Sequence, residues 1–222
     1  MGLKERWAEA LAANPREVQT RPISWGQAIA VMAALTAVLW VVEIVNVADD
    51  YGLNRFGLVP RQVDGLWGVL TMPFLHASAY HLLANTGPFL LIGWVVMLTG
   101  WRTFTVVSVL CIVLGGVLAW LIGPSHTTIV GVSGLVFGWL GYIVARAVFS
   151  RRIAWIASAV VVLLLFGTMF FSLIPQQTHG GIGEVSWEAH LAGLVAGLVA
   201  GWLFHPRKAK QAALRFRKAS VR

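Results

Sequence analysis

The chain is dominated by long apolar runs that short polar turns separate. Six runs reach or approach the roughly 20 residues that cross a hydrocarbon core, and they lie at 24–47, 80–98, 104–122, 134–149, 153–173 and 189–204. A segment inside hydrocarbon must satisfy its own backbone hydrogen bonds, so these runs predict helices. The first run is too long for a signal peptide and lacks a small-residue cleavage site after it, so we expect a retained helix. The predicted fold class is an all-α, polytopic membrane protein with six transmembrane helices.

Composition supports this prediction and limits the function. Of the 222 residues, 58% are hydrophobic and 12% are charged, whereas a soluble domain is about half apolar and a quarter charged. The formal net charge of +8 could suggest nucleic acid, but the basic residues punctuate the apolar runs or crowd the two ends, so we expect no nucleic-acid partner. The single cysteine, Cys111, excludes an internal disulfide and a multi-cysteine metal site.

The basic residues also predict the orientation in the membrane. Of the 17 Lys and Arg residues, only Arg55 and Arg61 lie in the long loop after the first run. The others lie before the first run, around the second and fourth turns, and in the tail, so the positive-inside rule places both termini in the cytoplasm. We expect a cytoplasmic segment at 1–23, a membrane domain at 24–205 and a basic cytoplasmic tail at 206–222. The tail is interpreted as an anchor to anionic lipid rather than as a partner-binding arm.

Polar residues within three of the runs lie at a common depth. Asn85, Ser133 and His190 each precede the basic residue that ends their run by 17 or 18 positions. At 1.5 Å per residue this places all three roughly 26 Å above the cytoplasmic ends, just below the outer face of the bilayer. His81 lies one turn before Asn85 on the same helix face. Polar groups inside a bilayer are costly and mark functional positions.

Ser133 and His190 form a candidate nucleophile and general base. Glycines recur near them at positions 134, 138 and 141 and at positions 193, 197 and 201, a pattern that lets two membrane helices pack closely. No acid is well placed to orient the imidazole, because Glu188 points to another helix face and Glu43 lies in the first run. The sequence therefore predicts a Ser-His dyad, a known departure from the three-residue arrangement.

The oxyanion of an acyl-transfer reaction needs hydrogen-bond donors. Gly131 and Gly134 flank Ser133 where a loop enters a helix. The backbone N–H groups there point outward, and the helix dipole favours negative charge at that end. Asn85 and His76 are the candidate side-chain donors.

Three segments together resemble the core of the rhomboid family of intramembrane serine proteases, over roughly residues 24–205. They are His76-Ala77-Ser78-Ala79-Tyr80-His81-Leu82-Leu83-Ala84-Asn85, Gly131-Val132-Ser133-Gly134 and Ala189-His190-Leu191-Ala192-Gly193. The resemblance implies a six-helix rhomboid-like bundle, Ser133 as nucleophile and His190 as general base. It also implies an oxyanion hole from Asn85, His76 and the Ser133 backbone, with His81 in support, no metal or cofactor, and single-span membrane proteins as substrates.

The chain departs from the family pattern at two positions. Phe137 stands where bacterial relatives often have a tyrosine that stacks on the histidine, so stacking is expected without the phenol hydrogen bond. Trp67 is followed by Gly68 where many relatives carry a Trp-Arg pair.

Several alternatives stay open. The chain could be a rhomboid-like protein without proteolysis that binds or escorts membrane clients. A small transporter or channel would show polar residues near the midplane and often inverted repeats, and neither appears in this sequence. The loop at 176–184 is either a movable cap or a plain surface loop. Glu43 is expected to be a structural residue that partly snorkels, or else a member of a polar network.

Overall fold

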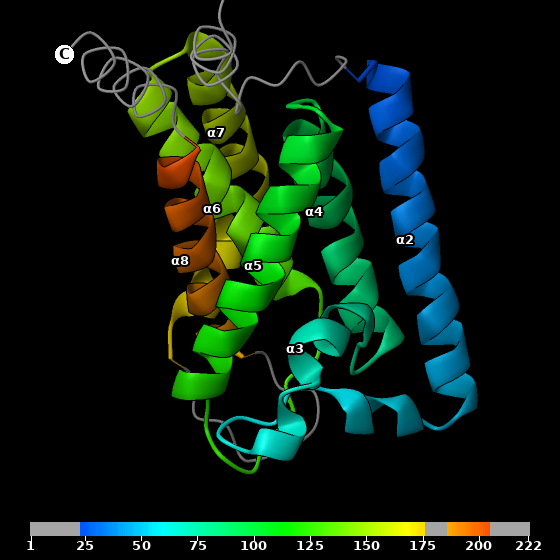
Figure 1. Cartoon of the computed structure of the whole chain (residues 1–222). Helices are drawn as coiled ribbons and strands as arrows, with labels where there is room; N and C mark the ends of the chain where they lie inside the picture. The colour runs from blue at the N-terminus through cyan, green and yellow to red at the C-terminus, as the bar shows by residue number, and fades with distance from the viewer. Residues whose placement is uncertain (1–22, 176–185, 205–222) are drawn as a thin grey trace, which may run out of the picture.

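The computed structural model of this protein describes residues 23–175 and 186–204 (Figure 1). Within those residues the long elements are the helices α2 (Trp25–Ala48), α4 (Ala79–Met97), α5 (Trp101–Ile122), α6 (Ser133–Ser150), α7 (Ile153–Phe166) and α8 (Trp187–Leu203). Shorter helical turns are η1 (Gly52–Phe56), η2 (Val63–Gly65), α3 (Gly68–Thr71) and η3 (Met72–Phe74) in the first loop, and η4 (Gly167–Leu173) after α7. The long helices alternate in direction, so α2 begins and α8 ends at the same end of the bundle (Figure 1). The prediction of an all-α polytopic bundle is confirmed.

The helices agree with the predicted spans to within a few residues. Five segments are long and apolar enough to cross a membrane, and the fifth of them, Ile153–Leu173, joins α7 to η4. The sixth, α8, is apolar but only 17 residues long, which is the lower end of the spanning range of about 17–25 residues. The apolar pattern did not predict the change from α- to 3₁₀-helix at Gly167, because the residues on both sides are equally apolar.

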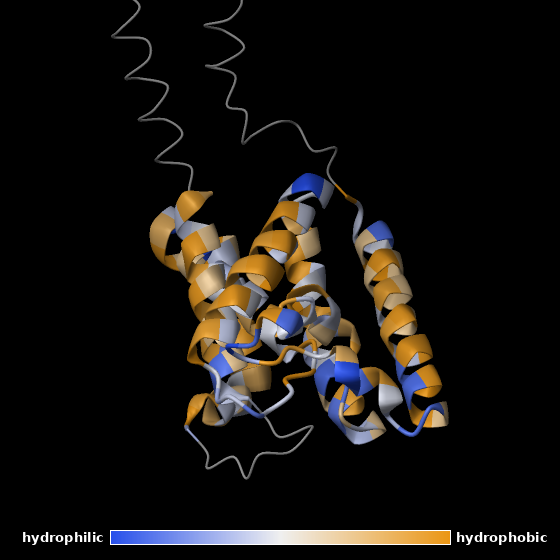
Figure 2. Ribbon diagram, turned by 60° about the horizontal axis from the view of Figure 1, so that its bottom comes forward, coloured by the Kyte–Doolittle hydropathy of each residue, from blue (hydrophilic) through white to orange (hydrophobic). Residues whose placement is uncertain are grey.

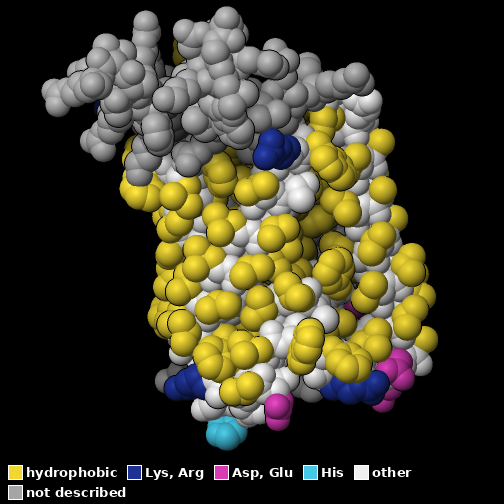
Figure 3. Space-filling view, in the orientation of Figure 1, with side chains coloured by type: hydrophobic (Ala, Val, Ile, Leu, Met, Phe, Trp, Pro, Cys, Tyr) yellow, Lys and Arg dark blue, Asp and Glu magenta, His cyan; other side chains and the backbone are white. Residues whose placement is uncertain are grey.

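The lateral surface of the bundle is apolar. Val41, Ile153 and Leu164 are each at least 60% exposed. Figure 2 shows hydrophobic residues along the helices, and Figure 3 shows apolar side chains over the middle of the molecule with Lys, Arg and His near its ends. So continuous an apolar surface would promote aggregation in water, but it matches the interior of a bilayer. The chain is therefore a multi-pass membrane protein.

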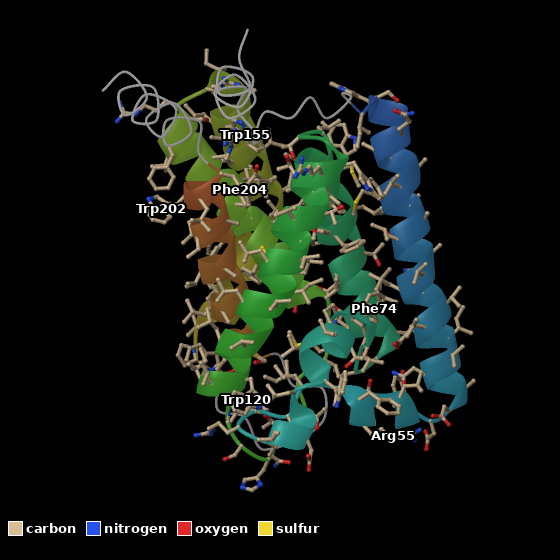
Figure 4. All side chains as sticks on the ribbon, viewed as in Figure 1. Arg55, Phe74, Trp120, Trp155, Trp202 and Phe204 are labelled. Carbon is tan, nitrogen blue, oxygen red and sulfur yellow. The ribbon has the colours of Figure 1, made fainter. Side chains whose placement is uncertain are left out.

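Some aromatic residues lie toward the ends of the bundle (Figure 4), where Trp and Tyr are enriched in membrane proteins generally. Trp155 and Phe204 lie near the end where α8 finishes, and Trp120 lies near the other end. Arg146 of α6 connects the first two, because its Nη1 donates to the Phe204 carbonyl at 2.7 Å and its guanidinium lies 5.2 Å from the centre of the Trp155 ring. This arginine links α6 to α7 and to the end of α8.

The central helix is α6, which packs against α4, α5, α7 and α8. Every residue from 133 to 143 is buried. At its middle, the Trp139 ring lies between Phe89 of α4 and Phe104 of α5, with ring centres 5.1 and 5.4 Å away. The Trp139 Nε1–H donates to Ser108 Oγ at 2.9 Å. Ser133 is the first residue of this helix, so its side chain is held by a fully packed element.

Helices α6 and α8 touch along their backbones, as the repeated glycines predicted. A Cβ atom added to Gly193 would lie 2.0 Å from the Gly134 carbonyl oxygen, and one added to Gly197 would lie 1.8 Å from that of Gly138. Real Cβ atoms do not approach an oxygen closer than about 3.0 Å. Only glycine at these positions permits this separation, which is what lets a short serine side chain reach the neighbouring helix.

The first loop is fixed to the rest of the bundle by backbone and amide hydrogen bonds. Leu58 and Ile129 exchange two backbone bonds of 3.0 and 2.8 Å, which attach this loop to the segment leading into α6. The side-chain amides of Asn46 and Asn54 both donate to the His76 carbonyl at 3.1 Å. The approach to α4 is thereby held against the end of α2.

Candidate active site

Ser133 and His190 meet at the interface of α6 and α8. The distance between Ser133 Oγ and His190 Nε2 is 2.8 Å, and the two residues are 8% and 5% exposed. Ser186 caps α8 by accepting a hydrogen bond from the Ala189 N–H at 3.2 Å, so the helix begins at Trp187 and His190 lies in its first turn. The two residues that the sequence singled out are in hydrogen-bond contact although 57 positions separate them.

The imidazole of His190 stacks on Phe137. The ring centres are 4.6 Å apart and the planes are inclined by 26°. Phe137 lies one turn after Ser133 in α6 and is fully buried. The predicted stacking is confirmed, and it holds the imidazole plane from one side while the hydrogen bond to Ser133 orients its edge.

The other imidazole nitrogen contacts a residue that sequence reasoning missed. His190 Nδ1 lies 2.8 Å from Ser172 Oγ and 3.2 Å from the Ser172 carbonyl oxygen. Ser172 belongs to η4, which follows α7. The carboxylate of Glu188 instead accepts a hydrogen bond from the Ser186 hydroxyl at 2.9 Å. A lone serine near the end of an apolar run carries no signal of this contact.

The loop before Ser133 has a conformation that requires glycine. Gly131 has a φ of +127°, a region that other residues rarely adopt, and its N–H donates to the Met72 carbonyl at 2.9 Å. A Cβ atom there would lie 3.2 Å from His81 Nε2 and 3.5 Å from Ser133 Oγ. The first N–H groups of α6, including those of Ser133 and Gly134, have no acceptor within the helix. They create a positive end beside the Ser133 hydroxyl.

The two histidines of the approach to α4 lie in different environments. His76 is fully buried, and its Nε2 accepts a long hydrogen bond of 3.4 Å from the Val132 N–H. Burial and the neighbouring His81 lower the pKa of His76 to about 3, so its ring is neutral. The His81 ring lies 5.3 Å from it and faces Gly131. Asn85 is buried one turn further along α4, where its Nδ2 donates to the His81 carbonyl at 3.1 Å.

The Rhomboid domain family matches residues 63–207, which include the segments that carry these side chains. The chain belongs to the rhomboid family. A protein of Mycobacterium tuberculosis (strain ATCC 25618 / H37Rv), described only as uncharacterized, is 35% identical over 207 residues, 91% of this chain and 85% of the relative. An uncharacterized protein of Mycobacterium leprae (strain TN) is 32% identical over 210 residues, 92% of this chain and 82% of the relative. The rhomboid protease GlpG of Haemophilus influenzae is 24% identical over 185 residues, 80% of this chain and 91% of GlpG.

Further expectations for this rhomboid domain concern residues outside the pair. Glu43 is 1% exposed, so the expectation that its side chain partly snorkels is wrong. The helix α2 turns this residue toward the bundle rather than toward the lipid. Within residues 23–175 and 186–204, no three His, Cys, Asp or Glu side chains gather where they could hold a metal ion. The loop at 176–184, the possible cap, lies outside the described residues.

Proposed function

We propose that this rhomboid-family protein is an intramembrane serine protease, with Ser133 as nucleophile and His190 as general base. The observation that carries the proposal is the 2.8 Å contact between Ser133 Oγ and His190 Nε2 at the buried interface of α6 and α8. A hydroxyl becomes a useful nucleophile when an adjacent base takes its proton. The name of the relative from Haemophilus influenzae, a rhomboid protease, supports the same chemistry.

The proposed reaction has two halves. Ser133 Oγ attacks the substrate carbonyl carbon while its proton moves to His190 Nε2, and the C–N bond breaks as the imidazolium gives that proton to the leaving amine. Water then attacks the acyl-enzyme, again losing a proton to His190. The bond between the acyl carbon and Ser133 Oγ breaks as the imidazolium returns that proton to Oγ, and the acid product leaves. Stacking on Phe137 keeps the ring in place through both halves.

The oxyanion is proposed to bind donors at the beginning of α6. The Ser133 backbone N–H, flanked by Gly131 and Gly134, and the Asn85 side chain keep the roles that the sequence suggested for them. The contacts of the two histidines favour His81 over His76 as the further side-chain donor. His76 Nε2 already accepts a hydrogen bond from a backbone N–H, whereas His81 Nε2 lies beside Gly131, two residues before Ser133.

Substrates are proposed to be single-span membrane proteins, which reach the pair from the surrounding lipid. The distribution of Lys and Arg supports cytoplasmic termini and a site near the outer face of the bilayer. No metal or cofactor enters the proposed reaction, because the hydroxyl, the imidazole and the N–H donors supply each step.

The alternative is a rhomboid-family protein that binds or escorts membrane clients without cutting them. The hydrogen-bonded serine and histidine favour the protease, since a binding protein needs neither group in contact with the other.

The deciding experiment uses purified protein in liposomes with a single-span test substrate. We expect wild-type protein to cleave, and the Ser133→Ala and His190→Ala variants to be inactive but normally folded. Ser158→Ala is the matched control, because Ser158 is half-buried on α7 and, within the described residues, its hydroxyl bonds the Ala154 carbonyl of its own helix. A fluorophosphonate should label wild-type protein at Ser133 and fail to label the His190→Ala variant. Equal cleavage by wild-type and Ser133→Ala protein would refute the protease.

A further inference from the structure

The contact between His190 and Ser172 extends the pair into a directed chain of hydrogen bonds. Ser172 Oγ lies 2.6 Å from the Met169 carbonyl oxygen and 2.8 Å from His190 Nδ1. A serine hydroxyl has one hydrogen to donate, and a carbonyl oxygen can only accept. The Ser172 hydrogen therefore points at Met169, and Ser172 Oγ accepts a hydrogen from His190 Nδ1.

The same argument determines the state of the imidazole. His190 Nδ1 also faces the Ser172 carbonyl oxygen at 3.2 Å, which again can only accept. Both contacts require the hydrogen on Nδ1. A neutral ring with its hydrogen on Nδ1 has a free lone pair on Nε2, which is the atom that lies 2.8 Å from Ser133 Oγ. The geometry of Ser172 thus selects the tautomer in which His190 can act as a base.

We propose that Ser172 is the positioning residue for His190, a neutral counterpart of the acid in a catalytic triad. This inference rests on the proposed protease function. When His190 takes the Ser133 proton, the imidazolium donates from Nδ1 to the Ser172 hydroxyl and carbonyl oxygens. Ser172 keeps its own proton, bonded to Met169, throughout the cycle. It stabilises the charged ring without itself exchanging a proton.

Ser172 makes these contacts from the 3₁₀ turn η4. A helical serine hydroxyl can bond the carbonyl three or four residues earlier, and Ser172 bonds the one three residues earlier. The tighter winding from Gly167 to Leu173 is longer than most 3₁₀ runs, which rarely exceed about four residues. It orients the hydroxyl and the carbonyl of Ser172 toward the same imidazole nitrogen.

The test compares Ser172→Ala, Ser172→Thr and the matched control Ser158→Ala in the liposome cleavage assay. The Ser158 hydroxyl also bonds a carbonyl of its own helix, and within residues 23–175 and 186–204 it makes no hydrogen bond to a histidine. Removing a hydrogen bond to a charged group should lower kcat by about 10- to 100-fold in Ser172→Ala, the loss being partial because the carbonyl contact remains. We expect KM and the thermal unfolding temperature to change little. Ser172→Thr, which keeps the hydroxyl, should recover most of the lost kcat, and Ser158→Ala should match wild type.

The rate of fluorophosphonate labelling at Ser133 should fall by the same factor in Ser172→Ala, because acylation needs the same base. Wild-type kcat in Ser172→Ala, or a loss that Ser172→Thr does not recover, would overturn the positioning role while leaving the protease intact. A lower unfolding temperature with unchanged kcat would also overturn it, since Ser172 would then be structural only. Cleavage that does not depend on Ser133 would overturn both proposals.

Discussion

Replacing Gly193 by alanine tests whether the close approach of α6 and α8 is what brings the pair together. The added Cβ would lie 2.0 Å from the Gly134 carbonyl oxygen and 2.8 Å from its carbonyl carbon. Both are backbone atoms of a packed helix, so they cannot rotate away as the end of a side chain can. The helices must separate by about 1 Å to bring the contact to the usual minimum of 3.0 Å.

That displacement would also separate Ser133 Oγ from His190 Nε2, because Gly134 follows Ser133 directly and Gly193 lies one turn after His190. Adding about 1 Å to the 2.8 Å separation of Oγ and Nε2 takes it beyond hydrogen-bond range. A misplacement of this size can lower a catalytic rate about 100-fold. Overpacking also costs about 1–3 kcal/mol of stability.

The assay is single-span substrate cleavage in liposomes, with thermal unfolding in detergent measured in parallel. Gly26→Ala is the matched control, because Gly26 is also helical and a Cβ there would meet nothing within 4 Å. Gly193→Ala should lose cleavage and unfold at lower temperature, and Gly26→Ala should do neither. If Gly193→Ala cleaved and unfolded like wild type, the backbone contact would not control the site. Loss of stability alone would mean that the pair tolerates the separation.

Three further substitutions test single contacts. Phe137→Leu removes the stacking on His190, worth about 0.5–1.5 kcal/mol, so cleavage should fall by about 2- to 10-fold; an unchanged rate would argue against a role for the stacked ring. Ser108→Ala leaves the buried Trp139 N–H without its acceptor, so the free energy of unfolding should fall by about 1–3 kcal/mol in a denaturation assay while cleavage by folded protein stays normal. His81→Ala removes a proposed oxyanion donor, so kcat should fall by about 100- to 1,000-fold with little change in KM; wild-type kcat would exclude that role.

The apolar runs determined most of the fold in advance. Length and hydrophobicity are enough to place a membrane helix, because the bilayer itself imposes both. They do not determine backbone winding, so the 3₁₀ segment η4 was not predicted at the end of the fifth run. Nor did the position of Glu43 near the outer end of its run show which way the residue turns, and its burial against the bundle was not expected.

For the site too, local sequence patterns predicted some features and tertiary packing decided others. Ser133, His190 and Phe137 were identifiable because the glycine-flanked serine, the histidine and the ring one turn after the serine are local sequence features. The roles of His76 and His81 were assigned without knowledge of which ring faces Gly131. That depends on how the first loop packs against the end of α2, through contacts between residues far apart in the chain.

By itself, the sequence determined that this chain spans a membrane, which residues could react, and that two of its helices could pack backbone to backbone. Composition and short spacings carry that information, because bilayer thickness and helix geometry are the same for every protein. Only the tertiary structure decided that Ser172 completes the contacts of His190. The rotation of one helix against another and the 3₁₀ winding of η4 follow from packing of the whole bundle, and no local pattern encodes them.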